Sequence, residues 1–330
     1  MSQTAASPIL HALQVRQIRR EAEGIHSFEL VDPEGQALPA FEAGAHLDVH
    51  IPTAQGVQVR QYSLCNDPAE RHRYVIAVLR EAQGRGGSQG MHTAVQVSQT
   101  LQVSTPRNHF ALAQGTGPVT LLGGGIGITP LKAMAHTLVR AGRDFVLHYC
   151  ARSTERLAFH DALLAAFGPQ RVRFHLDQGR PSEGLDLATA LRDVAPGAQL
   201  YYCGPAGFMA ACAQASAHWP EGSVHCEHFK APEPAAGTAP AAEPGSFVVQ
   251  LARSGQVFTV RAEQTLVEGL AGVGVEVPTS CISGLCGTCK VDYLAGEVEH
   301  LDHILGDDEK ASCLTACVSR GKAGTLVLDL

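Results

Sequence analysis

The chain has 330 residues, of which 45% are hydrophobic, and its formal net charge is −7 at pH 7. This length allows two or three domains with separate cores, and the acidic balance leaves no basic surface for a nucleic-acid partner. No signal-peptide pattern opens the chain and no apolar run reaches membrane-spanning length. Together with ten cysteines, which indicate a reducing compartment, these features predict a cytoplasmic protein that does not enter a membrane.

The first predicted module, residues 1–114, is a closed antiparallel β-barrel. Glycine and proline turns separate its β-rich runs, and no long helical period intervenes. The runs are Leu47–Ile51, Val57–Leu64, Tyr74–Leu79 and Leu101–Ser104. Arg60 and Arg85 could each pair with phosphate, and Tyr62 offers an aromatic face to a flat ring. Either segment alone is better explained as a surface strand with solvated arginines, but their occurrence together, upstream of a phosphate-binding turn and a cysteine loop, favours a cofactor.

The second module, residues 115–230, alternates strands with helices, which predicts a parallel sheet with helices on its faces. The predicted elements are Val119–Leu122, Leu131–Arg140, Phe145–Cys150, Leu157–Phe167, Val172–Leu176 and Leu200–Cys203. A glycine-rich turn follows the first strand, and we expect Thr129 to cap the next helix with Pro130 in its first turn. Such a helix start binds phosphate. A Rossmann fingerprint needs an acidic residue after the next strand, where Arg152 stands instead, so a dinucleotide would be held differently or not at all.

The last predicted module, residues 246–330, follows an extended linker over residues 231–245, which holds four prolines among alanines and glycines. Phe247–Leu251 and Val257–Val260 predict a hairpin, and a short helix is expected over Thr265–Ala271. This arrangement is typical of a small β-grasp ferredoxin domain.

Four cysteines in this module have the C-x4-C-x2-C spacing, with a distant fourth cysteine, of a plant-type 2Fe-2S cluster. They are Cys281, Cys286, Cys289 and Cys317. Gly284 and Gly287 lie between them, where the backbone must approach the cluster and positive φ is expected. Structural zinc is the alternative, but its sites usually pair two C-x2-C units, and only one is present here.

These motifs together resemble the phthalate dioxygenase reductase family, the flavin–NADH–ferredoxin reductases that serve aromatic-ring oxygenases. The resemblance spans essentially the whole chain and includes the order barrel, nucleotide module, ferredoxin. It depends on the segments Arg60-Gln-Tyr-Ser-Leu-Cys-Asn-Asp67, Gly84-Arg-Gly-Gly-Ser88, Gly123-Gly-Gly-Ile-Gly-Ile-Thr-Pro130, Cys203-Gly-Pro205, His225-Cys-Glu-His-Phe229, the cysteine loop and Ala316-Cys-Val-Ser-Arg320.

The resemblance implies FMN, NADH and a 2Fe-2S cluster as cofactors. Implied FMN-binding residues in the barrel are Arg60, Gln61, Tyr62, Ser63, Ala77, Val78, Arg80, Arg85, Gly86, Gly87 and Ser88. Implied residues around the ring and the NADH groove are Thr129, Phe229, Gly124, Gly125, Gly127, Cys203, Gly204 and Pro205. The implied catalytic residues are Cys203, Glu227 and Ser63, and the family pattern implies Cys317, not Cys313, as the fourth cluster ligand. The short turn before Ser88 has no obvious adenosine-binding insertion, which agrees with FMN rather than FAD.

The activity implied is that of a reductase component of a Rieske-type aromatic-ring oxygenase, which passes electrons from NADH to a terminal oxygenase protein. A monomer is expected. The residues leave two alternatives open. One is a different acceptor, either a cytochrome P450 or a carnitine-type monooxygenase, and the other is a non-catalytic redox sensor or carrier. Arg152 also leaves NADPH open as the nucleotide, although NADH is preferred.

Overall fold

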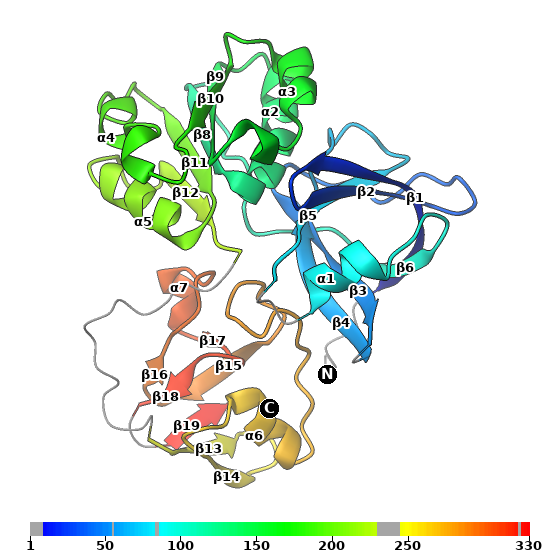
Figure 1. The fold of residues 1–330 in the computed structure, drawn as a ribbon. Helices are drawn as coiled ribbons and strands as arrows, with labels where there is room; N and C mark the ends of the chain where they lie inside the picture. Colours follow the sequence, from blue (N-terminus) through cyan, green and yellow to red (C-terminus); the bar gives the residue numbers. More distant parts are fainter. Residues whose placement is uncertain (1–8, 55, 83–85, 230–244, 323–324) are drawn as a thin grey trace. The chain divides into compact units, whose positions relative to one another are not determined.

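The computed structural model describes residues 9–54, 56–82, 86–229, 245–322 and 325–330. They fall into two compact units, an N-terminal unit that ends at Phe229 and a C-terminal unit that runs from Gly245 to Leu330 (Figure 1). All of the predicted linker except Gly245 lies outside the described residues. Among the helices described, none combines the length and the apolar character that crossing a membrane requires.

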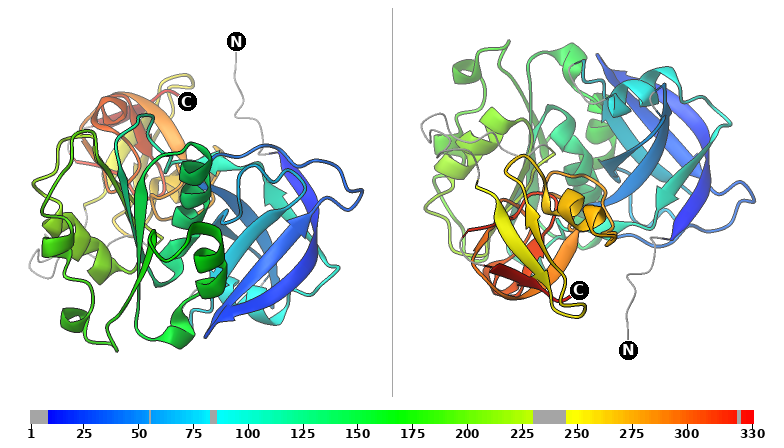
Figure 2. Two further views of the ribbon diagram at one scale, coloured as in Figure 1. Left: turned by 90° about the horizontal axis from the view of Figure 1, so that it is seen from above. Right: turned by 90° about the horizontal axis from the view of Figure 1, so that it is seen from below.

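An antiparallel sheet curls into a barrel in the first half of the N-terminal unit (Figure 2). Its elements are β1 (Leu10–Ala22), β2 (Ile25–Val31), β3 (Ala45–Thr53), β4 (Gly56–Ser63), β5 (Tyr74–Leu79), α1 (Gly87–Thr93), β6 (Thr100–Ser104) and β7 (Arg107–Asn108). The strand order is β4-β3-β6-β1-β2-β5, with β7 beside β3. A bridge between Leu64 and Ile76 joins the end of β4 to β5 and closes the barrel, as predicted.

Strand β3 shows why this sequence forms a barrel wall with two buried faces. Leu47, Val49 and Ile51 alternate along the strand and point into the apolar core, where none of them is exposed. Asp48 lies on the opposite face yet is also buried, and its carboxylate accepts hydrogen bonds from Gln61 and Arg107. The outer face of β3 is therefore covered, and the Asp48 carboxylate is satisfied by neighbouring strands, whereas the buried His46 Nε2 has no hydrogen-bond partner among the described residues.

The second half of the N-terminal unit is the predicted parallel sheet, with strand order β10-β9-β8-β11-β12. Its elements are β8 (Val119–Gly124), α2 (Ile128–Arg140), β9 (Phe145–Ala151), α3 (His160–Phe167), β10 (Val172–Leu176), α4 (Leu187–Ala190), β11 (Gln199–Cys203), α5 (Ala206–Ala215) and β12 (Val224–Glu227). Helices α2 and α3 cover one face, and α4 and α5 cover the other (Figure 1). The strand order reverses between β8 and β11, which places a crevice beyond their carboxyl ends.

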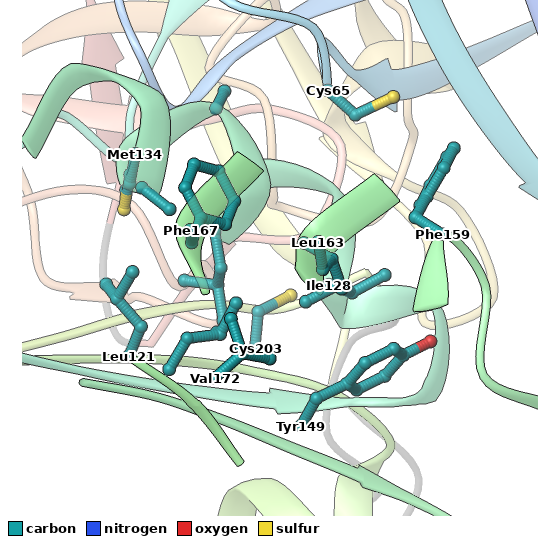
Figure 3. Close-up of a cluster of buried hydrophobic side chains, with 14 of the residues drawn as sticks. Cys65, Leu121, Ile128, Met134, Tyr149, Phe159, Leu163, Phe167, Val172 and Cys203 are labelled. Carbon is teal, nitrogen blue, oxygen red and sulfur yellow. The ribbon is translucent and has the colours of Figure 1, made fainter. Parts of the chain in front are cut away.

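One hydrophobic cluster runs through both halves of the N-terminal unit (Figure 3). Cys65 of the barrel half belongs to the same cluster as Phe159 and Cys203 of the sheet half. Lys132 of α2 also donates a hydrogen bond from Nζ to the Cys65 carbonyl at 2.8 Å, and its ammonium lies 5.2 Å from the centre of the Phe159 ring. The two predicted modules are thus lobes of one compact unit.

The C-terminal unit has a mixed sheet with strand order β14-β13-β19-β15-β17. Its elements are β13 (Phe247–Leu251), β14 (Val257–Val260), α6 (Leu266–Gly272), β15 (Lys290–Ala295), β16 (Val298–Glu299), α7 (Asp307–Lys310), β17 (Cys313–Thr315), β18 (Arg320–Gly321) and β19 (Thr325–Leu328). Thr265 caps α6 because its hydroxyl accepts the Glu268 N–H while the Glu268 carboxylate accepts the Thr265 N–H. The predicted hairpin and helix are confirmed, as is the multidomain fold class.

Candidate cofactor sites

The four cysteines of the predicted cluster site converge in the C-terminal unit, and each exposes at most 9% of its surface. Their thiols form two hydrogen-bonded pairs, Cys281 with Cys286 and Cys289 with Cys317. Within the described part of the chain, no three His, Cys, Asp or Glu side chains are placed to enclose a single metal ion. Two pairs of thiols match a cluster with two iron atoms, each of which takes two ligands from the protein.

The backbone of this loop aims N–H groups at the thiols. The Leu285 N–H donates to Cys281 Sγ at 3.4 Å, and the Gly284 N–H donates to the Cys317 thiol. Gly284 has φ of +69°, and a Cβ there would lie 2.8 Å from Val318 Cγ2. Gly287, with φ of +68°, has the same conformation, so the predicted positive φ values are confirmed.

Hydrogen bonding within each thiol pair favours the thiolate form of one cysteine, which is the form that binds iron. The Cys281 thiol donates to Cys286 and lowers the pKa of Cys286 to about 5. In the second pair, the hydrogen bond from Cys289 lowers the pKa of Cys317. Thiolates are the ligands of iron–sulfur clusters, so the donor set and its N–H groups fit a 2Fe-2S cluster.

The implied phosphate-binding residues of FMN lie together in the barrel lobe, where α1 contacts both β4 and β5. A Cβ on Gly87 would lie 2.6 Å from Arg60 Cγ, so the Arg60 side chain lies directly against the start of α1. Ser88 Oγ accepts the Glu81 N–H at 3.1 Å, and Gly86 adopts φ of +84°. A guanidinium beside the first N–H groups of a helix fits a phosphate, which needs positive charge and donors. Arg85 lies outside the described residues.

The remaining implied FMN residues lie on β4 and at the end of β5. Tyr62 packs against the barrel core, and burial raises the pKa of its hydroxyl. The Gln61 amide is turned toward Asp48, to which it donates at 2.7 Å. Ala77 and Val78 are buried on β5, and the exposed Arg80 follows them.

The three implied catalytic residues come from both lobes of the N-terminal unit. Ser63, at the end of β4, donates from Oγ to Glu227 Oε2 at 3.4 Å. Cys203 pairs with Glu227 in the register of β11 and β12, and it is fully buried. Burial raises the pKa of the Glu227 carboxyl to about 8 and also raises the pKa of the Cys203 thiol. At neutral pH this site therefore holds a proton on Glu227 and a neutral thiol that is a poor nucleophile.

Replacing Glu227 with glutamine should stabilise the N-terminal unit in a pH-dependent way. The pKa of Glu227 is higher in the folded than in the unfolded protein. Its contribution to the free energy of unfolding is therefore fully present below its unfolded pKa, and it is lost as pH rises toward 8. We expect the free energy of unfolding of Glu227→Gln to exceed that of the wild type by about 1–2 kcal/mol at pH 8 to 9 and to converge toward it near pH 5. Thermal release of flavin fluorescence measures this. A difference that is constant with pH would contradict the assignment.

The glycine turn after β8 and the Cys203-Gly204-Pro205 turn after β11 meet at the crevice. A Cβ on Gly124 would lie 3.0 Å from Pro205 Cδ, and one on Gly127 would lie 2.1 Å from the Cys203 carbonyl oxygen. A Cβ on Gly204 would lie 3.1 Å from the Cα of Gly124. Only glycine permits this close approach of the two turns at the point where a dinucleotide would cross the sheet.

Two expectations about this turn and the following helices were wrong. Thr129 is not a helix cap, because a 3-10 turn over Gly125–Gly127 leads straight into α2, whose cap position is Gly127. The Thr129 hydroxyl is buried and donates to the Ile126 carbonyl at 3.0 Å. Helix α3 also begins at His160 rather than Leu157, because Phe159 adopts φ of +62° and interrupts the helical path. Phe229 is 39% exposed at the end of the N-terminal unit.

Sequence reasoning missed two acidic residues near the sites. Asp177 directly follows β10, and its N–H donates to the Ala151 carbonyl at 3.2 Å, which places it beside Arg152. The acid expected after the second strand therefore stands after the neighbouring strand, and the same edge-of-sheet rule applied one strand further would have found it. Asp302 lies against the cysteine loop, and no spacing pattern in the sequence indicates this contact.

Comparison with known proteins identifies the family. A family model described as a 2Fe-2S iron-sulfur cluster binding domain matches residues 249–322, which favours the cluster over zinc. The tert-butanol monooxygenase / tert-amyl alcohol desaturase reductase subunit of Aquincola tertiaricarbonis is 49% identical over 96% of this chain and 95% of that protein. Phthalate dioxygenase reductase of Burkholderia cepacia is 42% identical over 96% of this chain and 97% of its own length.

Solved structures agree with these relatives. A phthalate dioxygenase reductase structure, described as a modular structure for electron transfer from pyridine nucleotides to 2Fe-2S, has a TM-score of 0.72 at 42% identity and covers 97% of this chain and 98% of that one. An intact type IV self-sufficient cytochrome P450 monooxygenase has a TM-score of 0.86 at 37% identity; the match covers 98% of this chain but only 41% of that one. The chain belongs to the phthalate dioxygenase reductase family, the iron–sulfur flavoprotein oxidoreductases that use FMN, NADH and a 2Fe-2S cluster as reductase components of oxygenase systems.

Proposed function

We propose that this chain takes electrons from NADH through FMN to its 2Fe-2S cluster and delivers them to a Rieske-type aromatic-ring oxygenase. This proposal depends on the presence of two sites in one chain. One is the cysteine loop with its N–H donors, and the other is the crevice at which Ser63 donates to Glu227. Bound FMN accepts electrons as a pair and releases them singly, which matches a two-electron donor to a one-electron cluster.

We also propose module boundaries at 1–114, 115–230 and 246–330 around the 231–245 linker, and a cytoplasmic monomer.

Within this proposal, the chain's own residues bind, orient and hold a proton. Arg60 and the first N–H groups of α1 bind the FMN phosphate. The two turns at the crevice admit the NADH pyrophosphate because Gly124 and Gly127 have no side chains to force the turns apart. Glu227 holds a proton at Oε2 beside Ser63, so the site carries no carboxylate charge at neutral pH.

Asp177 is expected to make the nucleotide NADH rather than NADPH. Asp177 directly follows β10 and Arg152 directly follows β9, so the two residues occupy adjacent positions at the sheet edge where an adenosine ribose binds in folds of this type. A 2′-phosphate would be attracted by Arg152 and repelled by Asp177. We expect Asp177→Ser to raise kcat/KM for NADPH by about tenfold, equivalent to about 1.4 kcal/mol, with a smaller change for NADH. Arg152→Ala is the matched variant, and it should lower kcat/KM for NADPH. An unchanged ratio of the two nucleotides in Asp177→Ser would refute this role.

Anaerobic stopped-flow mixing with NADH tests the relay itself. Flavin absorbance should fall first and cluster absorbance should follow, because the cluster is reduced only through the flavin. If the flavin is reduced while the cluster stays oxidised, the relay is wrong and a redox sensor or carrier becomes the better description. The same experiment with NADPH shows whether nucleotide preference has been assigned correctly.

A cytochrome P450 is the second candidate acceptor. Its support is the self-sufficient P450 monooxygenase, 41% of which matches 98% of this chain. NADH-driven reduction of a purified Rieske oxygenase and of a purified P450, each at equal concentration, discriminates between the two acceptors.

A further inference from the structure

A buried carboxylate lies next to the cysteine loop in the C-terminal unit. Asp302 stands between β16 and α7, and its side chain has 0% exposure. Its Oδ1 accepts the N–H groups of Ile304 at 3.2 Å and Leu305 at 2.8 Å. Its Oδ2 is buried and has no hydrogen-bond partner among the described residues. Burying a carboxylate without full hydrogen bonding costs free energy, so this charge needs a functional explanation.

The His300 side chain faces Asp302 Oδ2 but makes no hydrogen bond to it. His300 Nδ1 lies 3.7 Å from Asp302 Oδ2, which is beyond hydrogen-bond distance, and this nitrogen is also buried without a partner in the described chain. The pair is therefore held close without a direct bond. Replacing Asp302 with asparagine therefore puts a neutral side chain in place of an acidic one without breaking a hydrogen bond to His300.

Asp302 is coupled to the cluster ligands through Gly284. A Cβ on Gly284 would lie 2.9 Å from the Asp302 Cα, and the neighbouring His303 N–H donates to the Gly284 carbonyl at 3.0 Å. The Gly284 N–H in turn donates to the Cys317 thiol. One residue thus separates the backbone of Asp302 from a cluster ligand, and no solvent reaches the Asp302 side chain to screen its charge.

We propose that Asp302 is a positioning residue that holds the cysteine loop and lowers the reduction potential of the 2Fe-2S cluster, an inference that rests on the proposed function. Reduction brings one electron from the flavin and converts one ferric ion to ferrous, with no bond formed or broken. A fixed negative charge nearby opposes that added electron. Asp302 thereby makes the reduced cluster a stronger donor to the next acceptor.

The test is Asp302→Asn in the full-length holoprotein, examined by anaerobic redox titration with EPR detection of the cluster. Asparagine keeps an oxygen for the Ile304 and Leu305 N–H groups, and its amide can donate to His300 Nδ1, so the substitution isolates the charge. We expect the cluster midpoint to rise while the flavin midpoint stays constant. Asp308→Asn is the matched control, because Asp308 is exposed on α7 and solvent screens it. Equal midpoints in wild type, Asp302→Asn and Asp308→Asn would overturn the proposal.

Two further variants separate tuning from loop support. Asp302→Ala also removes both backbone hydrogen bonds, so it should lower cluster content in addition to raising the midpoint. His300→Gln keeps the carboxylate and should leave the midpoint at or below that of wild type; a higher midpoint in this variant would contradict the role of Asp302, even if Asp302→Asn failed to assemble. Chemical titration sets these midpoints without NADH, so failure of the relay in stopped-flow mixing is distinguishable from failure of this inference.

Discussion

Replacing Cys317 with serine should abolish the cluster signal while NADH still reduces the flavin. Cys317 is buried, accepts the Gly284 N–H and is paired with Cys289, so its loss would remove one of the two cysteine ligands of an iron atom. Electron delivery to a protein acceptor such as cytochrome c should fall to background. EPR and visible absorption measure cluster content, and stopped-flow absorbance measures flavin reduction.

Cys313→Ser is the matched control for this prediction. Cys313 lies only four residues earlier, but its Sγ donates to Asp292 Oδ1 at 2.9 Å and is only partly buried. Cluster content and electron delivery should equal those of wild type. If Cys313→Ser removes the cluster and Cys317→Ser preserves it, the assignment of Cys317 as the fourth ligand is wrong.

Gly127→Ala should slow NADH-driven flavin reduction by about 100-fold. The new Cβ would lie 2.1 Å from the Cys203 carbonyl oxygen and 2.4 Å from its carbon, and neither backbone atom can move without displacing β11. Displacing the two turns by even about 1 Å is enough for a 100-fold loss where a substrate must be aligned. Single-turnover reduction at saturating NADH, normalised to flavin content, gives the rate.

Gly117→Ala separates this local effect from general destabilisation. A Cβ at Gly117 would lie 2.0 Å from the Gly197 carbonyl oxygen, an equally severe clash at the opposite, amino-terminal edge of β8 and β11. Both variants should have a lower Tm. The folded Gly117→Ala protein should reduce its flavin at the wild-type rate, and an equal slowing in both variants would show that the crevice has no special role.

The sequence was most informative where local patterns act alone. Val172–Leu176 and Tyr74–Leu79 form strands with the predicted bounds, because a short β-rich run between turns leaves little freedom. Thr265 and Glu268 satisfy each other as a capping box, so the start of α6 could be placed correctly. The C-x4-C-x2-C spacing predicted the cluster site because the ligands of one loop must be local.

Features that depend on tertiary contacts could not be predicted. The start of α3 depends on Phe159, whose strained φ is held by the cluster shared between the two lobes. The same limit applies to the site: the contact between Ser63 and Glu227 joins residues 164 positions apart. Asp302 belongs to no recognisable motif, and it acquires its neighbours only when the chain folds.

The cluster shared by the two lobes of the N-terminal unit bears on how such chains can be recombined. A cut near residue 114 would strip Cys65 of the Phe159 and Lys132 contacts and expose an apolar face to water. The C-terminal unit has its own core around Val249, Leu314 and Leu328. In gene fusions and domain exchanges, residues 9–229 should therefore be kept together as one unit. The iron–sulfur unit, in contrast, can be gained, lost or moved to another position in the chain without destroying either hydrophobic core.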